Sequence, residues 1–346
     1  MNRAKTTITI RDVAQAAGLS VSTVSRVLNN KADVSPQTSR KVRQVIEELG
    51  YTSSLAARSM RSRRTNVIGL VLTNVGDPFS VQVMRGINQA IVEFGYDLIV
   101  YTGGGHQEQS PAEQEQRYVS LLDSSITDGM IVVTPTATTF STASPLVVVD
   151  PNKENPDYPA VIADNRIGAL QAMEYLIGLG HRRIGFINGR PDLQSANQRR
   201  QGYQDGLRQA NLTFDPELVQ VGDYSVGTGF TSAQKLLQLS NPPTAIFAAN
   251  DQSAFGVFRA AQEVGLSIPD DLSVVGFDNT PEAAYINPTL TTVDQSVDKL
   301  GYAATEMLIR LIEGKSVAGN LYKMPTQLIV RASCRAIAGR VDRETG

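Results

Sequence analysis

The chain has 346 residues, which is enough for two or three domains with sizeable hydrophobic cores. Its net charge of −2 hides an uneven distribution: residues 1–64 carry 12 Lys and Arg against 4 Asp and Glu, which leaves 20 of the 32 basic and 30 of the 34 acidic residues to the remainder. Cys334 is the only cysteine, which excludes an intrachain disulfide, and because neither a secretory leader nor an apolar run of roughly 20 residues is seen we expect a cytoplasmic protein.

Residues 8–30 have the pattern of two short helices joined by a tight turn. Thr9 and Asp12 have the spacing of a capping box at the start of the first helix. Gly18 supplies the turn, because a residue without Cβ adopts positive φ at no steric cost. Ser20 is an N-cap for the second helix, whose apolar residues recur at i, i+3 and i+4. A helix pair of a bundle would share these features, but we interpret the pattern as a helix-turn-helix.

The polar face of the second helix carries groups that can meet base edges and phosphates in a major groove. These groups belong to Val21, Ser22, Ser25, Arg26 and Asn29. A third helix is expected over 35–49, with Ser35 as N-cap and Gly50 just past its end. Three such helices form a compact head, and the basic charge of this part of the chain suits a polyanion such as DNA.

Residues 51–64 are rich in basic and polar residues, and Met60 is a large apolar side chain among them. A helix over 55–60 would have fewer residues than the roughly 12–15 at which an isolated helix becomes marginally stable, so it would need a partner to form. One interpretation is a hinge helix that folds on DNA and inserts Met60 between base pairs in the minor groove. The other is a basic linker in which Met60 has no role.

From Thr65 onward, apolar runs alternate with amphipathic segments. The runs predict strands at 67–72, 96–101, 129–133, 146–150, 160–164, 183–188, 219–221, 245–249, 273–277 and 290–293. The amphipathic segments predict helices at 80–94, 113–123, 167–179, 199–210, 226–239, 252–264 and 297–312. This alternation predicts an α/β fold with parallel sheets covered on both faces. The number of elements favours two doubly wound lobes over a single sheet.

Polar side chains cluster just past several of the predicted strands, where ligands bind in such sheets. They belong to Asp77, Asp150, Asn250, Asp251, Asp278 and Asn279, with the aromatic Phe79 two residues after Asp77 and Arg199 expected at the start of a helix. Carboxylates, amides, an arginine and an aromatic ring together suit a sugar, whose hydroxyls pair with donors and acceptors while its C–H face packs on the ring. Each residue taken singly has an alternative role as a helix cap or loop residue.

Catalytic and cofactor motifs are missing from the sequence. It has no G-x-G-x-x-G, no phosphate-binding G-x-x-x-x-G-K-[ST] and no G-x-S-x-G nucleophile elbow. His106 and His181 are the only histidines, and neither has a metal-ligand neighbour at a suitable spacing. We therefore expect no enzyme, no metal and no cofactor, and a structural role for His181.

The order of these parts resembles the LacI/GalR family of bacterial transcription regulators, up to about Ala338. The motifs that carry the resemblance are D-V-A-Q-A-A-G-L-S-V-S-T-V-S-R-V-L-N, G-H-R-R-I-G-F-I-N-G, R-R-Q-G-Y, A-A-N-D-Q-S-A-F-G and V-V-G-F-D-N. It implies a helix-turn-helix head, a hinge helix and two lobes of periplasmic-binding-protein type joined by three crossovers. The implied boundaries are 1–50 for the head, 51–64 for the hinge, 65–163 with 294–324 for the N-lobe, 164–293 with 325–338 for the C-lobe, and 339–346 for a tail.

The family pattern also implies roles for individual residues on DNA. It assigns base reading to Val21, Ser22 and Arg26, and places near bases or phosphates Thr9, Ser20, Thr23, Ser25 and Asn29. Ala57 and Met60 match the hinge positions that enter the minor groove. Met60 departs from the usual leucine, and Ser53 and Ser54 replace the usual Pro-Asn, which puts the stability of the hinge helix in question.

In the effector domain, the resemblance implies sugar contacts from Asp77, Phe79, Asp150, Arg199, Asn250, Asp278 and Gln295, with Tyr224 as a stacking ring. Arg199 would anchor the sugar with Asp278 across from it. Pro151 stands where the ribose-type site has an arginine, which argues against ribose itself. A free monosaccharide is our first expectation, and a disaccharide or a sugar phosphate is the alternative.

The function that follows is a repressor of carbohydrate-utilisation genes, a homodimer or tetramer on a near-palindromic operator, released when a small sugar binds between the lobes. We expect it at the nucleoid and not at a membrane. The alternative is a corepressed regulator, in which the ligand strengthens DNA binding. Two other classes, a transport solute-binding protein and an enzyme, fit less well, because the head is basic and no nucleophile–base pair is evident.

Overall fold

A computed structural model describes residues 8–28, 31, 33–51, 64–103, 110–123, 126–317 and 319–337 of the chain. The chain divides into two compact units, Met1–Thr65 and Asn66–Gly346. Each unit has its own hydrophobic core. Most of the predicted hinge, including Ala57 and Met60, lies outside the described residues, as do Asn29, His106 and the tail.

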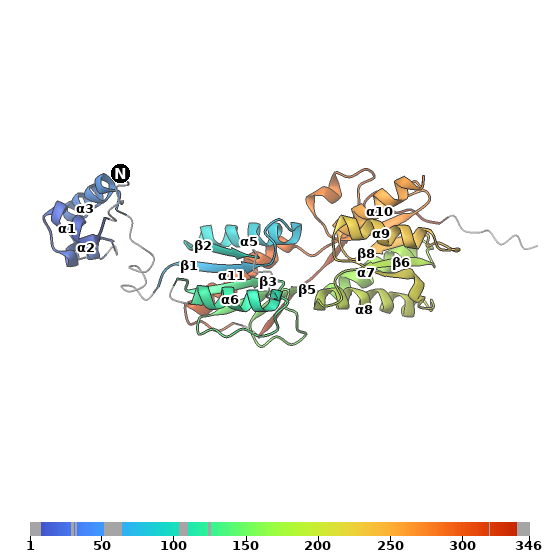
Figure 1. The fold of residues 1–346 in the computed structure, drawn as a ribbon, viewed down its shortest axis with the longest axis horizontal. Helices are drawn as coiled ribbons and strands as arrows, with labels where there is room; N and C mark the ends of the chain where they lie inside the picture. The colour runs from blue at the N-terminus through green and yellow to red at the C-terminus, as the bar shows by residue number, and fades with distance from the viewer. Residues whose placement is uncertain are drawn as a thin grey trace, which may run out of the picture. The chain divides into compact units, whose positions relative to one another are not determined.

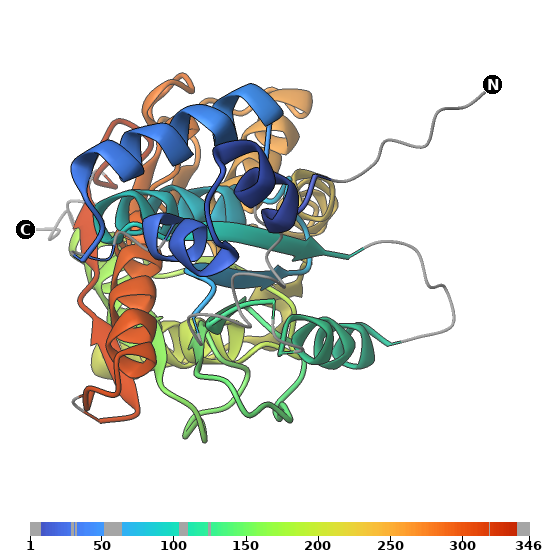
Figure 2. The ribbon, with the colours of Figure 1, turned by 90° about the vertical axis from the view of Figure 1, so that its left-hand side faces the viewer.

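The first unit contains three short helices (Figure 2). They pack around a small apolar core. These are α1 (Ile10–Ala17), α2 (Val21–Leu28) and α3 (Pro36–Leu49). The predicted capping box is present, since the Asp12 carboxylate accepts from the Thr9 amide at 2.7 Å and the Thr9 hydroxyl accepts from the Asp12 amide. Gly18 ends α1 with a φ of 63°, in the left-handed region that favours glycine. The local signals therefore produce the predicted helix pair and the third helix.

The second unit contains two six-stranded sheets (Figure 1). The first has the strand order β11-β5-β4-β3-β1-β2 and is parallel throughout. Its strands are β1 (Val67–Leu72), β2 (Asp97–Thr102), β3 (Gly129–Val133), β4 (Leu146–Val149), β5 (Ala160–Ala163) and β11 (Leu321–Met324).

The second sheet has the order β12-β10-β9-β8-β6-β7, and only β12 runs antiparallel to its neighbour. Its strands are β6 (Ile184–Asn188), β7 (Val219–Val221), β8 (Ala245–Ala248), β9 (Ser273–Asp278), β10 (Thr291–Asp294) and β12 (Gln327–Ile329). Central strands of both sheets are buried along their whole length, as expected for parallel strands covered on two faces.

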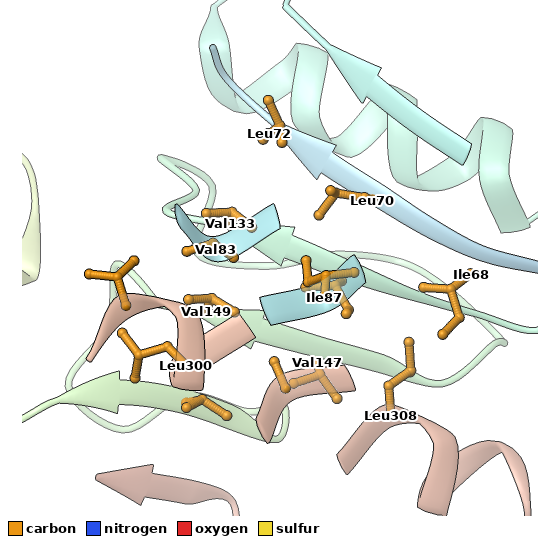
Figure 3. Close-up of a cluster of buried hydrophobic side chains, with 14 of the residues drawn as sticks. Ile68, Leu70, Leu72, Val83, Ile87, Val133, Val147, Val149, Leu300 and Leu308 are labelled. Atoms are coloured by element: carbon orange, nitrogen blue, oxygen red, sulfur yellow. The ribbon is translucent and has the colours of Figure 1, made fainter. Parts of the chain in front are cut away.

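Helices cover both faces of each sheet (Figure 1). On the first sheet, α5 (Pro78–Phe94) and α11 (Val297–Ile312) pack together on one face, and α6 (Pro111–Asp123) covers the other. On the second sheet, α7 (Asn165–Gly178) and α8 (Gln194–Gln209) lie opposite α9 (Val226–Leu237) and α10 (Asp251–Glu263). Figure 3 shows the core of the first lobe, where Ile87 of α5 and Leu308 of α11 meet Ile68, Leu70 and Val147.

The chain passes between the sheets three times, after β5, after β10 and after β11. The first sheet with its helices is called the N-lobe below, and the second the C-lobe. The loops at the carboxyl ends of the parallel strands of both lobes line a common cleft. No helix of the described part of the chain is both long and apolar enough to cross a membrane.

Three elements differ from the sequence-based expectation. Strands β11 and β12 were not predicted, because each has only three or four residues and most of its side chains are partly or fully exposed, so no apolar run marks it. Helix α8 begins at Gln194 and not at Arg199, so the prediction that Arg199 opens a helix is wrong. Its first turn is polar, and its N-cap position is Leu193, which makes no side-chain cap. The usual start signal is therefore missing.

Candidate functional site

The loops at the carboxyl ends of the two sheets enclose a cavity of about 230 Å³. From the N-lobe it is lined by Thr73, Asn74, Asp77, Pro78, Phe79, Ser80, Thr134 and Asp150. From the C-lobe it is lined by Arg190, Leu193, Ser195, Arg199, Asp223, Tyr224, Asn250, Gln252 and Asp278. Seven of the eight residues expected to bind the effector are among them. The eighth, Gln295, lies behind Asp278 and donates from Nε2 to its Oδ1 at 2.6 Å.

Arg199 is held rigidly at the centre of this cleft. It lies in the second turn of α8 and is 5% exposed. Its guanidinium donates to the Ala249 carbonyl at 2.5 Å and to Asn165 Oδ1 at 2.8 Å, and it stacks over the Phe277 ring with 3.9 Å between the guanidinium carbon and the ring centroid. Nη1 lies 3.6 Å from Asp278 Oδ1. The guanidinium is thus oriented before any ligand arrives, which favours bidentate recognition.

Asp278 presents a carboxylate to the cavity from a strained backbone position. Its φ is 113°, and that of Asn279 is 55°, so two consecutive residues lie in the left-handed region. Arg331 donates from Nη2 to Asn279 Oδ1 at 2.6 Å, and the Thr280 amide donates to Asp251 at 2.7 Å. Burial raises the pKa of Asp278 above its ordinary value, an effect that Arg199 partly offsets. The surrounding hydrogen bonds therefore hold this carboxylate in place.

Asp150 is a partly buried carboxylate that lines the cavity from the N-lobe. Its Oδ2 accepts from the Ser195 hydroxyl of the C-lobe at 2.9 Å, whereas Oδ1 is buried and has no hydrogen-bond partner within the described structure. The Thr134 hydroxyl, on the same wall, is likewise buried without a partner there. Burial raises the pKa of Asp150 above its ordinary value, and it raises the pKa of Tyr224 to about 12. Unpaired buried polar atoms are costly, so their position indicates a polar ligand.

Two of the predicted residues also serve as helix caps, the alternative role noted from the sequence. Asp77 caps α5, its carboxylate accepting from the Ser80 amide at 2.9 Å. Asn250 caps α10, its Oδ1 accepting from the Ser253 amide at 2.9 Å while Nδ2 donates to the Tyr224 carbonyl at 3.0 Å. Both side chains still line the cavity. Capping and ligand contact are therefore compatible at these strand ends.

The cavity is also lined by residues that the sequence analysis did not identify. Those missed include Thr73, Asn74, Thr134, Arg190, Ser195, Asp223 and Gln252. Several follow predicted strands directly, so the same strand-end rule would have found them.

Asp251 does not line the cavity but is fully buried behind it, and His181 is structural as expected. The His181 ring bonds to Thr244, Ser273 and the Arg335 carbonyl at 2.9, 3.0 and 3.2 Å.

In the first unit, α2 presents a distinct exposed face. Val24 and Val27 are buried in the head, while exposed or partly exposed positions hold Ser20, Val21, Ser22, Thr23, Ser25 and Arg26, with Thr9 exposed before α1. Arg26 pairs with Asp33 at 3.1 Å, but both side chains are more than half exposed. Such a pair is worth little and can be exchanged for a phosphate or a base. Of the residues predicted to contact DNA, Asn29, Ala57 and Met60 lie outside the described residues.

Metal binding finds no support in the part of the chain that the structure describes. No three His, Cys, Asp or Glu side chains among those residues are grouped to hold an ion. The cavity has carboxylates on both sides, and those of Asp77, Asp150 and Asp278 each have at least one oxygen paired with a hydroxyl, an amide or the guanidinium.

A helix-turn-helix head followed by a two-lobed, cleft-containing α/β unit defines a DNA-binding protein with a ligand-binding domain. Comparison with known families agrees with this architecture. Residues 9–54 match the family described as "Bacterial regulatory proteins, lacI family", and residues 173–334 match a "Periplasmic binding protein-like domain". The chain belongs to the LacI family and is a transcriptional regulator, not an enzyme.

Full-length relatives support the assignment. The chain is 31% identical over 332 residues to the HTH-type transcriptional repressor PurR of Aliivibrio salmonicida, covering 94% of this chain and 98% of that protein. It is 32% identical over 339 residues to the HTH-type transcriptional repressor CytR of Escherichia coli strain K12, covering 96% and 98%. The Lac repressor dimer bound to operator and the anti-inducer ONPF has a TM-score of 0.85 at 28% identity, over 96% of this chain and 100% of that one. The CelR–cellobiose complex has a TM-score of 0.71 at 29% identity, over 94% and 99%.

Proposed function

We propose that the protein is a repressor that dissociates from its operator when a small, neutral sugar binds in the cleft. The observation that carries the proposal is the buried polar wall contributed by both lobes. Asp150 and Thr134 approach from the N-lobe with unpaired oxygens, and Arg199 and Asp278 approach from the C-lobe. A ligand with several hydroxyls would supply donors to the carboxylates and acceptors to the arginine at once.

Charge in the cavity favours a neutral ligand over a phosphate ester. Four aspartates line it, against two arginines, and one of these, Arg190, is already paired with Asp192 outside the lining at 2.6 Å. A phosphate would have to approach buried carboxylates, and like charges in a buried site repel strongly. Of the three effectors considered, a monosaccharide, a disaccharide and a sugar phosphate, the sugar phosphate is therefore the least favoured.

The size of the cavity favours a monosaccharide. Its volume of about 230 Å³ lies below the roughly 300–1,000 Å³ of pockets that hold drug-sized molecules. Tyr224 and Phe79 line it and offer apolar surface for the C–H groups of a sugar ring. One observation favours the alternative, a disaccharide, because the similar CelR structure is a complex with cellobiose.

DNA recognition would be carried by the head. We propose that Val21, Ser22 and Arg26 read bases, and that Thr9, Ser20, Thr23, Ser25 and Asn29 lie near bases or phosphates. Ala57 and Met60 would act in a hinge helix over 55–60, within the hinge segment 51–64. The exposed face of α2 supports the first of these assignments. A homodimer with one head per half-site is proposed from the resemblance to the Lac repressor dimer on its operator.

For ligand binding to affect DNA binding, the dimer must have one arrangement that binds the operator and another that does not, and the effector must bind the two with different affinities. Typical coupling free energies are about 1–3 kcal/mol, which corresponds to a change of roughly 5- to 150-fold in operator affinity. Release of DNA by a sugar, and control of carbohydrate-utilisation genes, are the proposal. Corepression would use the same residues with the opposite sign of coupling.

The proposed sugar site is tested by Asp150→Asn and Arg199→Ala in the full-length protein, with Asp157→Asn as control. Asp157 is an exposed carboxylate paired with Lys153, away from the cavity. Loss of a hydrogen bond to a charged group costs about 1.5–3 kcal/mol, so sugar binding measured by calorimetry should weaken roughly 10- to 100-fold in Asp150→Asn.

Asp150→Asn is the more informative variant, because Arg199 also supports the Ala249 carbonyl and Asn165 and its loss could unfold the C-lobe. In Asp150→Asn, operator binding in the absence of sugar should match the wild type. Sugar binding that is unchanged by Asp150→Asn, in a panel of aldoses and ketoses, would exclude the proposed site.

A further inference from the structure

Helix α8 begins without a cap of its own. Its N-cap residue is Leu193, whose side chain cannot accept a hydrogen bond. The first amides of a helix have no partner within it and need a side chain, water or a ligand. Because α8 carries Ser195 and Arg199 in its first two turns, the manner in which its start is held bears directly on the cleft.

The missing cap comes from the other lobe. Oδ1 of Asn152, which follows β4 of the N-lobe, accepts from the Gln194 amide at 3.0 Å. The Asn152 amide group is oriented by a second bond, from Nδ2 to the Thr136 carbonyl at 3.4 Å. Two residues earlier in the same loop, Asp150 accepts from the Ser195 hydroxyl at 2.9 Å. The first turn of a C-lobe helix is thus capped from the N-lobe across the cleft.

We propose that Asn152 is a positioning residue, which caps α8 from the opposite lobe and so ties the approach of the lobes to the placement of Arg199. Asn152 itself does not line the cavity. Its cap forms only while the β4 loop and the first turn of α8 are in contact, so separating the lobes breaks it. The consequence for ligand binding rests on the proposed function, in which Arg199 contacts the effector.

The physical effect follows from what a cap contributes. Replacing a capping Asn by Ala typically shifts a helix-end equilibrium by roughly 2- to 30-fold, whereas Asp caps about as well as Asn. The arrangement that can bind ligand is the one in which the first turn of α8 is capped and Arg199 is in place. If loss of the cap makes this arrangement less populated by that factor, the apparent affinity for a ligand falls by the same factor, although no ligand contact is lost. A carboxylate at position 152 would still accept from the Gln194 amide but could not donate to the Thr136 carbonyl. The Asn152→Asp variant therefore distinguishes the effect of the cap from the effect of the bond to Thr136.

The test uses amide hydrogen exchange on the full-length protein without ligand, comparing wild type, Asn152→Ala, Asn152→Asp and Asn155→Ala. Asn155 is an exposed asparagine in the same loop and serves as the matched control. We expect exchange in a peptide covering 193–198 to accelerate roughly 2- to 30-fold in Asn152→Ala, while the second half of α8 is unchanged. Asn152→Asp and Asn155→Ala should behave as wild type.

Equal exchange in Asn152→Ala and wild type would overturn the proposal, as would an Asn152→Asp variant that behaves like Asn152→Ala. In the latter case the bond to Thr136, and not the cap, would be the contribution of Asn152. Because no ligand is used, this result is independent of the effector. If the exchange result is as expected but none of the aldoses and ketoses tested by calorimetry binds the wild type, the cap stands and the proposed function fails.

Discussion

Asp251 holds the loop that carries Asp278, although it does not reach the cavity itself. It is the first residue of α10, is fully buried, and accepts from the Thr280 amide and from the Thr292 hydroxyl at 2.7 and 2.6 Å. A Cβ on Gly276 would lie 2.3 Å from its Oδ1, so only glycine leaves room for it there. Such a carboxylate acts on the site through the backbone that it supports.

Replacing Asp251 by Asn should remove a pH dependence of stability. Burial raises the pKa of Asp251 to about 7 from 3.8, so between about pH 4 and 7 the folded state binds a proton that the unfolded state has released. Stability from this group is therefore greatest at low pH in that window and is lost as pH rises through about 7. An asparagine can still accept from Thr280 and donate to Thr292.

The check is urea unfolding of wild type and Asp251→Asn at pH 5 and pH 8. We expect the wild type to lose stability relative to the variant between the two values, while Asp157→Asn, altered at an exposed site, follows the wild type. Identical pH slopes for wild type and Asp251→Asn would show that Asp251 is ionised throughout in the folded protein.

For individual residues, the sequence pattern located the candidates at strand ends but not the hydrogen-bonded pairs that form between the lobes. Asp150, Asn250 and Asp278 were found because each ends or directly follows an apolar run, and Asp77 because it lies in the loop after the first run. Tyr224 and Gln295 came only from the family resemblance. Ser195 and Asn152 were missed, because their roles depend on contacts across the cleft, which no local pattern reports.

Helix pairs in this fold approach closely at glycines, and the pair α5 and α11 shows the effect most clearly. A Cβ on Gly86 would lie 1.7 Å from the Asp298 carbonyl oxygen, and one on Gly301 would lie 2.1 Å from the Val83 carbonyl oxygen. Both contacts are with backbone, which cannot rotate away. The two helices therefore need glycine at both positions to pack as they do over the first sheet.

We predict that Gly301→Ala destabilises the protein despite its better helix propensity. The propensity gain is about 1 kcal/mol, whereas overpacking costs about 1–3 kcal/mol and here requires movement of a whole helix. Gly178, at the end of α7, has no neighbour within 4 Å of a built Cβ and provides the control. In chemical denaturation, Gly301→Ala should unfold at lower urea concentration and Gly178→Ala should not. A Gly301→Ala variant as stable as Gly178→Ala would contradict the close packing.

Elements with a continuous apolar run or a clear cap were predictable, and those without were not. The strands β1, β3, β6 and β8 are buried along their length and coincide with predicted runs to within a residue. The short edge strands β11 and β12 are formed by their neighbours in the sheet and not by their own side chains. The start of α8 was missed for the same kind of reason, because its cap lies 42 residues earlier in the chain.

The molecule as a whole combines a basic head with an acidic ligand-binding unit. The excess of basic residues in 1–64 supplies attraction to DNA, and the acidic remainder confines that attraction to the head. Sequence could establish this organisation because the charge difference is large. How ligand binding reaches the DNA cannot be obtained from the pattern of one chain, since it depends on the arrangement of a dimer.

Arg26→Ala should weaken operator binding and reduce discrimination against random DNA. If Arg26 reads a base, its loss costs about 1–3 kcal/mol, or roughly 5- to 150-fold in affinity. The matched control is Arg335→Ala, because Arg335 also forms an exposed ion pair, with Asp270 at 2.9 Å, but on the effector-binding unit. Both variants are measured by fluorescence anisotropy at one fixed salt concentration. An equal loss on operator and random DNA would show that Arg26 contacts phosphate only.

The most direct test of the account is the effect of sugars on operator binding. A labelled operator, selected from random DNA by the protein itself, is titrated with wild type and Asp150→Asn in the presence of each aldose and ketose of the panel at fixed salt. The account predicts that one monosaccharide raises the operator Kd of the wild type by roughly 5- to 150-fold, and that Asp150→Asn needs roughly 10- to 100-fold more of that sugar for the same response. A sugar that lowers the Kd would establish corepression, and an equal response of both proteins would place the effector outside the cleft.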